Sequence, residues 1–343
     1  MLFKLAFIGF GTVGQGLSEI LIEKKDMLSK KFDFHWKVVA ISDFKMGSVY
    51  DKNGLDMKKI LNLVKSGKKI DEYSTGIKGM DSIETIKKTN SDTIVEVTYT
   101  DVKTGEPALT HIKTALNLGK NVVSTNKGPV VKQAIGLLKI AESNSSYYGF
   151  EGVVLAGTPA INLAKYTLAG NNITGFKGIL NGTTNYILTR MEEGMSYDEA
   201  LKKAQELGYA EADPTGDVEG LDALGKVVIL SNVVLGKNIT WQDVERKGIT
   251  EITIEDIKKA KAKGKRWKLI GSAKIHSDGS VKAKVWPEKL SLNDPLAGVG
   301  EAINALTFYT DELGPVIIVG PGAGRRETGF ALLINLLELN MKK

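Results

Sequence analysis

The sequence predicts an α/β protein of two domains, in which a doubly wound parallel sheet is followed by a second domain of α+β type. Three observations lead to this prediction. The chain has 343 residues, more than the roughly 250–300 at which single hydrophobic cores stop growing. Apolar strands alternate with amphipathic helices over residues 1–130, as in parallel sheets covered by helices on both faces. Beyond that point the alternation gives way to a less regular mixture of helices and strands.

Apolar periodicity places the elements of the first part of the chain. The predicted strands are Leu5–Phe10, Lys37–Ser42, Thr93–Thr98 and Val122–Thr125, with room for a short one at Tyr147–Glu151. The predicted helices are Val13–Lys25, Met57–Lys65, Glu106–Leu118 and Val130–Ser143. We expect residues 1–130 to form the first domain.

The second part of the chain mixes helices with a second set of strands. The predicted strands are Ile173–Leu180, Lys268–His276, Val281–Trp286, Ala305–Tyr309 and Val316–Val319, and the predicted helices are Thr184–Glu193, Tyr197–Leu207 and Leu221–Val234. We expect residues 131–320 to form the second domain. The last helix, Thr328–Leu339 within residues 321–343, is expected to pack back on the first domain.

Composition excludes several classes of protein. Because cysteine is absent, disulfides, thiolate zinc sites and a cysteine nucleophile are impossible, and the cytoplasm is the expected location. The three histidines lie far apart in sequence, so a histidine metal cluster is not expected. No stretch reaches the ~18 unbroken apolar residues of a membrane span, and the first strand begins too early for a signal peptide. We therefore expect no membrane partner.

The net charge of +6 raises the question of a nucleic-acid partner. One basic run stands out, formed by Lys258, Lys259, Lys261, Lys263, Lys265, Arg266 and Lys268. Such a run can be a patch for nucleic acid or phosphate. It can also be the solvated face of a helix that carries Glu255 and Asp256 at its start. No nucleic-acid motif appears elsewhere, so we favour the helix and expect no nucleic-acid partner.

A glycine-rich loop follows the first predicted strand. Gly9, Gly11 and Gly14 form the pattern G-x-G-x-x-G, and Thr12 and Val13 open the helix after it. Glycines at these positions allow a tight turn, a close approach of backbone to a pyrophosphate, and close helix–strand packing. The unpaired N–H groups at the helix start favour phosphate. In a βαβ context the loop predicts a Rossmann-type domain that binds a dinucleotide.

The choice between NAD and NADP depends on the end of the second predicted strand. Asp43 stands where an acid hydrogen-bonds a ribose hydroxyl, which favours NAD. Lys45 is close enough to receive a 2′-phosphate instead. Both cofactors stay open, with NAD expected to be at least as good as NADP.

A run of acids ends on one lysine. Asp222 and Lys226 are four residues apart on a predicted helix, so both lie on one helix face. Carboxylates can hold a substrate ammonium and a lysine can move protons, which suits chemistry on an amino acid. The simpler interpretation is a solvated acidic loop with a helix salt bridge. The acids are Glu211, Asp213, Asp217, Glu219 and Asp222.

Three segments together resemble the homoserine dehydrogenase family. They are GILNGTTNYIL at residues 178–188, the segment Tyr209–Lys226, and GPGAG at residues 320–324. The resemblance runs from Gly9 to about Leu337 and implies a Rossmann domain followed by a substrate and dimerisation domain. It implies interconversion of L-homoserine and L-aspartate 4-semialdehyde with NAD(P)(H), in threonine, methionine and isoleucine biosynthesis. The expected assembly is a homodimer built by the second domain's sheet. We expect no regulatory or kinase module after the Gly324 helix.

The resemblance implies roles for individual residues of the second domain. Lys226 matches the family's catalytic lysine, and Glu211 and Asp222 match acids that hold the substrate and order the proton relay. The positions that contact substrate are matched by Gly182, Thr183 and Tyr209.

Further roles fall in or near the first domain. Lys127 matches a second functional lysine near nicotinamide and substrate, and Thr98 and Gly324 match cofactor contacts. A monovalent cation site for Na⁺, made largely of backbone carbonyls, is matched by Glu151, Val154, Ala156 and Thr158. The chain departs from the family at Val97, where Asn or Asp is frequent, and at Ser42, where Arg is frequent. The second departure weakens the case for NADP.

The chemistry is consistent with the residues. Reducing an aldehyde needs a hydride at carbon and a proton at oxygen, and a lysine ammonium can supply the proton. A substrate carboxylate needs N–H donors at a helix start, which Asn181–Thr184 offers, with Thr183 or Thr184 as the expected cap. Two other functions remain open: a different two-domain amino-acid dehydrogenase, and a nucleotide-sensing binding protein. The intact Lys226, Asp222 and Glu211 argue against the sensor.

Overall fold

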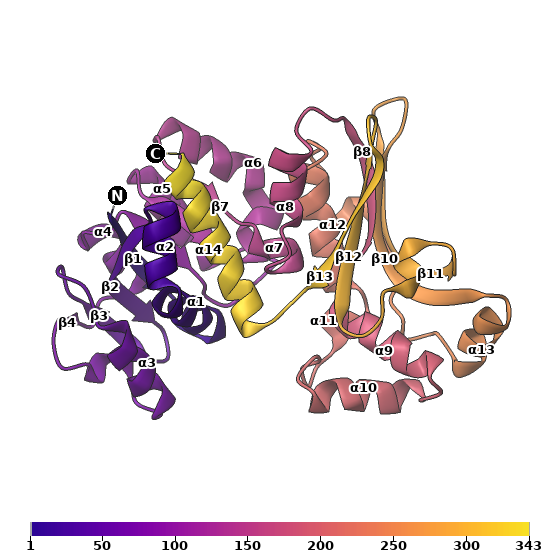
Figure 1. Ribbon diagram of the computed structural model, residues 1–343, viewed down its shortest axis with the longest axis horizontal. Coiled ribbons are helices and arrows are strands. Elements are labelled where there is room, and N and C mark those ends of the chain that lie inside the picture. The colour runs from indigo at the N-terminus through magenta and orange to yellow at the C-terminus, as the bar shows by residue number, and fades with distance from the viewer. Residues whose placement is uncertain (1, 343) are drawn as a thin grey trace. The chain divides into compact units, whose positions relative to one another are not determined.

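The first sheet has the strand order β4-β3-β2-β1-β5-β6-β7 in a computed structural model, which describes residues 2–342 (Figure 1). β1, β2, β5, β6 and β7 run parallel, and β3 and β4 extend the β2 edge as antiparallel neighbours. The strands are β1 (Leu2–Ile8), β2 (His35–Asp43), β3 (Gly47–Tyr50), β4 (Ile77–Lys78), β5 (Thr93–Glu96), β6 (Asn121–Ser124) and β7 (Tyr148–Gly149). The predicted parallel sheet is confirmed.

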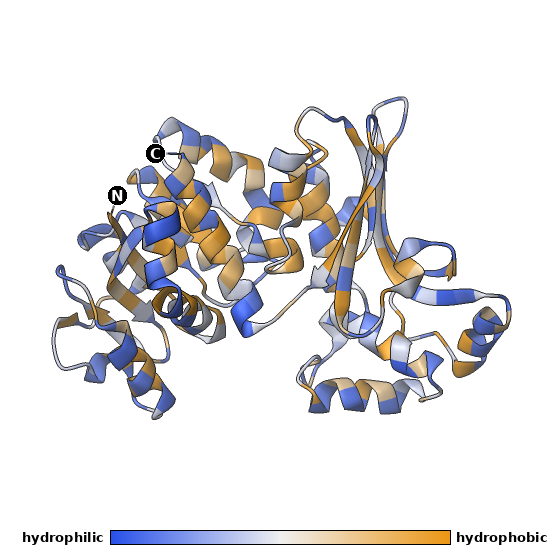
Figure 2. Cartoon of the chain, viewed as in Figure 1, coloured by the Kyte–Doolittle hydropathy of each residue, from blue (hydrophilic) through white to orange (hydrophobic). Residues whose placement is uncertain are grey.

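The helices of this unit carry both hydrophobic and hydrophilic stretches (Figure 2). Such amphipathic helices bury one face against a sheet. They are α1 (Thr12–Glu23), α2 (Lys25–Phe32), α3 (Met57–Lys65), α4 (Ser82–Lys88), α5 (Ala108–Asn117), α6 (Lys127–Ser143), α7 (Gly152–Leu155) and α14 (Arg325–Met341), with a short helical turn η1 (Ile70–Glu72).

The order of the strands reverses at β1. The chain passes from β1 to β2 on one side and later returns to β5 on the other. In open parallel sheets, ligands bind at this reversal, beyond the carboxyl ends of the strands. Gly9 lies there with φ +88°, and a Cβ on it would be 2.6 Å from the carbonyl oxygen of Val97. The first glycine of the loop is therefore required by both conformation and space.

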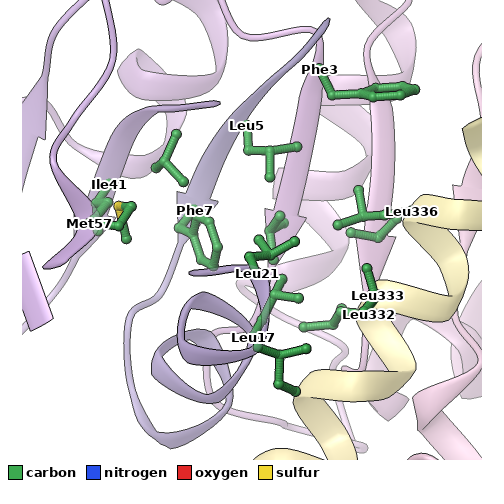
Figure 3. Packing of buried hydrophobic residues seen from close by; sticks show 14 of the residues in the cluster. Phe3, Leu5, Phe7, Leu17, Leu21, Ile41, Met57, Leu332, Leu333 and Leu336 are labelled. Atoms are coloured by element: carbon green, nitrogen blue, oxygen red, sulfur yellow. The ribbon is translucent and has the colours of Figure 1, made fainter. Parts of the chain in front are cut away.

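The core of this unit lies between the sheet and the paired helices α1 and α14. Figure 3 shows Leu17 and Leu21 of α1 near Leu332 and Leu333 of α14. The two helices approach closely where Gly329 meets α1, since a Cβ on Gly329 would lie 2.6 Å from the backbone nitrogen of Leu17. The C-terminal helix thus belongs to the same unit as the glycine loop.

Several elements of this unit were not predicted. They are α2, the antiparallel strands β3 and β4, and α4. Within α2 only Leu28 is buried, so its apolar periodicity is weak. For α4 the sequence does hold a signal: the side chains of Asp81 and Glu84 form a capping box at its start.

The chain divides into two units after Gly157, and the segment from Gly324 onward belongs to the first unit. The division predicted from the sequence lies after residue 130. α6 and β7 explain the difference, because α6 leads the chain back to the sheet and β7 then pairs with β6. No helix among residues 2–342 is both long enough and apolar enough to cross a bilayer.

The second unit contains a mixed sheet with the strand order β13-β12-β8-β10-β11-β9. All neighbours are antiparallel except β11 and β9, which are parallel. The strands are β8 (Ile173–Ile179), β9 (Val244–Arg246), β10 (Lys265–Ile275), β11 (Val281–Ser291), β12 (Ile303–Thr310) and β13 (Gly314–Pro321).

Two helices, α9 and α12, pack on this sheet, and α12 begins at the end of the acid-rich segment. The buried face of α12 is apolar throughout except for one lysine and one serine. The helices of the unit are α8 (Ala160–Asn162), α9 (Gly182–Glu192), α10 (Tyr197–Glu206), α11 (Thr215–Val218), α12 (Leu221–Val233) and α13 (Ile254–Ala262), with the turns η2 (Leu163–Thr167), η3 (Trp241–Asp243) and η4 (Pro295–Gly298).

The basic run is not one solvated helix face, as the sequence analysis had it. Its first part lies on α13, but Lys265 begins β10, and Lys268 faces inward with only 2% of its surface exposed. The ammonium of Lys268 donates hydrogen bonds to Oδ1 of Asn185 at 2.9 Å and to the carbonyl oxygen of Val299 at 2.6 Å. Consecutive residues 268–271 of β10 are all buried, so both faces of the strand are covered here, and the lysine anchors α9 to the sheet.

Replacing Lys268 by Met should remove a pH-dependent part of the stability. Burial lowers the pKa of Lys268 from its usual 10.5 to about 8. Between these values the unfolded chain binds more protons than the folded one, so stability attributable to this group rises with pH. Relative to Lys268→Met, the free energy of unfolding of the parent should increase by about 1–3 kcal/mol across this window. Urea unfolding at both ends of the window measures it; a constant difference would contradict the assignment.

Candidate functional site

A buried lysine stands at the centre of the polar cluster in the second unit. Lys226 on α12 is only 6% exposed. Its Nζ lies 2.8 Å from Oδ2 of Asp222 and donates a 2.6 Å hydrogen bond to the carbonyl oxygen of Leu180. The spacing of four residues thus forms the expected pair. Both partners are oxygen acceptors, which a buried ammonium requires because burial without them is strongly unfavourable.

Asn181 ties this pair to the acid-rich segment and to the next helix. Its Nδ2 donates to Oδ2 of Asp222 at 3.1 Å and to Oδ1 of Asp217 at 2.6 Å. Its Oδ1 accepts the backbone N–H of Thr184 at 2.9 Å. One side chain therefore fixes the relative positions of α9, α11 and α12.

The prediction that Thr183 or Thr184 caps the start of α9 is wrong. α9 begins at Gly182, and the preceding residue Asn181 has an extended backbone and caps the helix with its side chain. Thr183 and Thr184 lie inside the first turn, and the hydroxyl of Thr184 donates back to Asn181. Asparagine is among the preferred N-cap residues, so the sequence held this signal.

The residues expected to contact substrate gather at the same helix start. Thr183 donates its hydroxyl to the backbone oxygen of Tyr209 at 2.6 Å. The Tyr209 ring is 46% exposed and packs 5.1 Å from the ring of Tyr186. A Cβ on Gly182 would lie 2.6 Å from the carbonyl oxygen of Ala302, so the helix start needs glycine. Glu211 follows on the surface of the same loop, with an exposed side chain.

In the first unit, the glycine loop presents the start of α1 to solvent. Gly11 and Thr12 are exposed and Val13 is half-buried. Gly14 is buried, and a Cβ on it would lie 3.3 Å from the carbonyl oxygen of Gly9. The first turn of α1 carries no acid. Its N–H groups thus favour a phosphate, and the loop fits the pyrophosphate of a dinucleotide.

Asp43 lies beside the glycine loop. Its Oδ2 accepts the N–H of Phe10 at 2.8 Å, and its Oδ1 accepts the N–H groups of Lys45 and Met46 at 2.9 and 3.0 Å. These bonds hold the carboxylate at the end of β2 and leave acceptor capacity on Oδ2. Ser42 is buried and donates to the carbonyl oxygen of Met80 instead.

A buried carboxylate that the sequence analysis missed supports Thr98. Glu96, at the end of β5, is fully buried. Its Oε1 accepts the hydroxyl and the N–H of Thr98, and its Oε2 accepts the hydroxyl of Ser124 at 3.2 Å. His111 lies 3.5 Å away on α5. Burial, aided by the nearby Glu96, raises the pKa of Tyr148. An isolated acid in a strand gives no sequence signal for this role.

Lys127 begins α6 at the same edge of the sheet. Asn126 caps this helix by accepting the N–H of Gly128 at 3.2 Å. The Nδ2 of Asn126 also donates to the carbonyl oxygens of Thr98 and Tyr99 at 3.3 and 2.9 Å. The ends of β5 and β6 are thereby joined, which sets Thr98 and the start of α6 side by side.

The remaining predicted residues lie near the division between the units. Gly324 precedes α14 with φ +137°, a conformation that favours glycine. Glu151 is 1% exposed, and Val154 lies in the four-residue helix α7. Ala156 follows with φ +47°. Among residues 2–342 no group of three or more acids, histidines or cysteines is placed to bind a metal. The last carbonyls of a helix this short lack partners within it, which fits a cation.

Family models match both parts of the chain. The model described as homoserine dehydrogenase matches residues 159–337. A model described as glutamate/leucine/phenylalanine/valine dehydrogenase matches residues 4–139, the part that carries the glycine loop.

Relatives match nearly the whole chain. An NAD(+)-dependent homoserine dehydrogenase of Pseudomonas canavaninivorans is 44% identical over 98% of this chain and 96% of its own length. A homoserine dehydrogenase of Methanocaldococcus jannaschii is 43% identical over 98% of both chains. A solved structure of a hyperthermophilic archaeal homoserine dehydrogenase in complex with NADPH is 30% identical, with a TM-score of 0.85 over 100% of this chain and 99% of its own. The chain therefore belongs to the homoserine dehydrogenase family.

Proposed function

We propose that the protein is an NAD(P)-dependent homoserine dehydrogenase that interconverts L-homoserine and L-aspartate 4-semialdehyde by hydride transfer. The observation that carries the proposal is the buried ammonium of Lys226, held by Asp222 and the Leu180 carbonyl beside the start of α9. The reaction belongs to threonine, methionine and isoleucine biosynthesis. We also propose a cytoplasmic location, supported by the absence of cysteine.

The proposed chemistry divides between cofactor and lysine. A bound NAD(P)H supplies the hydride to the aldehyde carbon. Lys226 stabilises the negative charge that develops on the aldehyde oxygen and donates the proton, directly or through one water. In the reverse direction the neutral amine accepts the hydroxyl proton of homoserine. Asp222 keeps the lysine aimed and, with Glu211, holds the substrate ammonium. The N–H groups at the start of α9 hold the substrate carboxylate.

The remaining roles are proposals supported by position. Thr98 and Lys127 are proposed to contact the cofactor, because both stand at the carboxyl edge of the first sheet. Gly324 is proposed as a further cofactor contact. Glu151 with the carbonyls of Val154, Ala156 and Thr158 is proposed as a Na⁺ site, supported by the buried acid and the shortness of α7.

Two other functions are less well supported. A different amino-acid dehydrogenase is one of them. The match to the glutamate/leucine/phenylalanine/valine dehydrogenase model covers only residues 4–139 and leaves out the segment with Asp222 and Lys226. A sensor that has lost turnover would not need a lysine ammonium buried and paired in this way. Absence of homoserine oxidation in folded protein that binds NAD(P) would nevertheless favour the sensor.

Lys226→Ala should lower kcat by roughly 10²–10⁴, the usual effect of removing a general acid or base. Affinity for the cofactor should barely change, because Lys226 and the glycine loop lie in different units. Asp222→Ala should also reduce turnover, with a larger share of its loss in KM for homoserine. Steady-state kinetics with cofactor titrations measure these effects.

An exposed pair with the same spacing provides the control for this experiment. Lys247 lies 2.6 Å from Glu251, and the two side chains are 41% and 74% exposed. Lys247→Ala should leave activity unchanged and alter stability by at most about 1 kcal/mol. Near-normal kcat in Lys226→Ala, with a similarly small loss of stability, would show that the pair of Lys226 and Asp222 is only a structural salt bridge.

The protein should use NAD at least as efficiently as NADP. Asp43 is fixed beside the glycine loop and Ser42 points to Met80, so the family's frequent arginine has no counterpart there. The ratio of kcat/KM for NAD to that for NADP should be one or more. Lys45→Ala should leave this ratio unchanged. A strong preference for NADP that is lost in Lys45→Ala would show that the lysine binds the 2′-phosphate and outweighs the aspartate.

We infer that the protein forms a homodimer through the face of the second sheet that α9 and α12 leave open. Trp286, Tyr309, Ile317 and Val319 lie on this face and are 37–54% exposed. Light scattering should give twice the 37.1 kDa chain mass. A double variant, Ile317→Lys with Val319→Lys, should give monomers, whereas Leu313→Lys in the hairpin turn should not. A monomeric parent would contradict the inference.

A further inference from the structure

Asn304 is a buried amide without a partner. It lies on β12, is fully buried, and neither its Oδ1 nor its Nδ2 makes a hydrogen bond to any residue from 2 to 342. Nearly all buried side-chain amides are paired, and an unpaired one weakens the folded state. An unpaired amide is therefore expected to have a function, and the residues around Asn304 indicate which one.

The carboxamide of Asn304 is wedged between two glycine turns. A Cβ on Gly322 would lie 2.6 Å from Nδ2 of Asn304 and closer still to Oδ1. A Cβ on Gly182 would lie 3.2 Å from Oδ1. Both glycines therefore leave room for this side chain, and the amide touches bare backbone on two sides.

Each of these turns belongs to the proposed site. Gly182 is the first residue of α9, where Asn181 connects to Asp222 and Asp217. Gly322 belongs to the glycine-rich segment 320–324, which begins in the last two residues of β13 and ends at the proposed cofactor contact Gly324. Thr158 holds the same segment from another side, since its hydroxyl donates to the carbonyl oxygen of Pro321 at 3.0 Å.

We propose that Asn304 is a positioning residue for homoserine, whose carboxamide gains hydrogen bonds to the backbone of the Gly182 and Gly322 turns when substrate and cofactor draw the turns together. This inference rests on the proposed function. It explains why the strand retains an amide where an apolar residue would pack without an unpaired donor and acceptor. Because these hydrogen bonds form only in the ligand-bound conformation, they stabilise that conformation relative to the ligand-free one.

The test is Asn304→Leu, which keeps the branched shape and removes both polar atoms. In the absence of ligands its melting temperature should equal or exceed that of the parent, because the unpaired amide is removed. The KM for homoserine should rise by about three- to tenfold, the loss expected for one hydrogen bond. The rise in melting temperature produced by homoserine with NAD should shrink accordingly.

Ser231→Ala is the matched control. Ser231 is also fully buried, and its hydroxyl has no hydrogen-bond partner from 2 to 342, but it lies beyond Lys226 on α12. This variant should not change the KM or the ligand-induced rise in melting temperature. Asn304→Ala replaces Asn304→Leu if leucine blocks folding by its shape.

Two results would overturn the proposal. One is an unchanged KM for homoserine together with an unchanged ligand-induced rise in melting temperature in the Asn304 variants. The other is a lower melting temperature without ligands in both Asn304→Leu and Asn304→Ala, which would assign the amide a purely structural role, such as holding an internal water. Loss of homoserine oxidation by the parent itself would instead refute the proposed function, so the two failures are distinguishable.

Discussion

The arrangement of the second unit depends on one buried ion pair. The ammonium of Lys226 is almost entirely removed from water, and Asp222 and the Leu180 carbonyl oxygen lie within hydrogen-bond distance of it. A buried charge without such partners is strongly destabilising. The end of β8, the start of α9 and the first turn of α12 must therefore meet at one point. Asn181 enforces this meeting, because it bonds to Asp222 while capping α9.

Buried polar groups also fix the rest of α9. Its first turn is held by Asn181, and one turn later Asn185 binds the buried Lys268 of β10 and the carbonyl oxygens of Val299 and Ile303. A purely apolar contact would allow the helix to slide or rotate, whereas hydrogen bonds in a dry interior specify one position. The same logic holds in the first unit, where Glu96 and Asn126 join the ends of β5 and β6. In both units polar groups in the interior hold the loops that carry the proposed functional residues.

Local patterns in the sequence predicted the parts of this account that depend on short spacing. The glycine loop, the alternation of strands and helices, and the pair four residues apart are all visible within short windows. The roles of Glu96, Lys268 and Asn304, and the bonds from Asn181 to Asp217 and Asp222, are not, because each depends on partners brought together from distant parts of the chain. Lys268 shows the difficulty most clearly. It ends a basic run that resembles a solvated helix face, but it lies in a stretch of β10 that is buried on both faces.

The most direct test of the central claim is a double-mutant cycle on the buried pair, with kcat for homoserine oxidation measured in Lys226→Ala, Asp222→Ala and the double variant. If Asp222 supports the proton transfer through Lys226, the two residues act as a unit and their effects on kcat are not additive. The double variant should then be no more than about threefold slower than Lys226→Ala, within the error of such cycles. Losses in kcat that multiply in the double variant would contradict the account and show that the two side chains act independently.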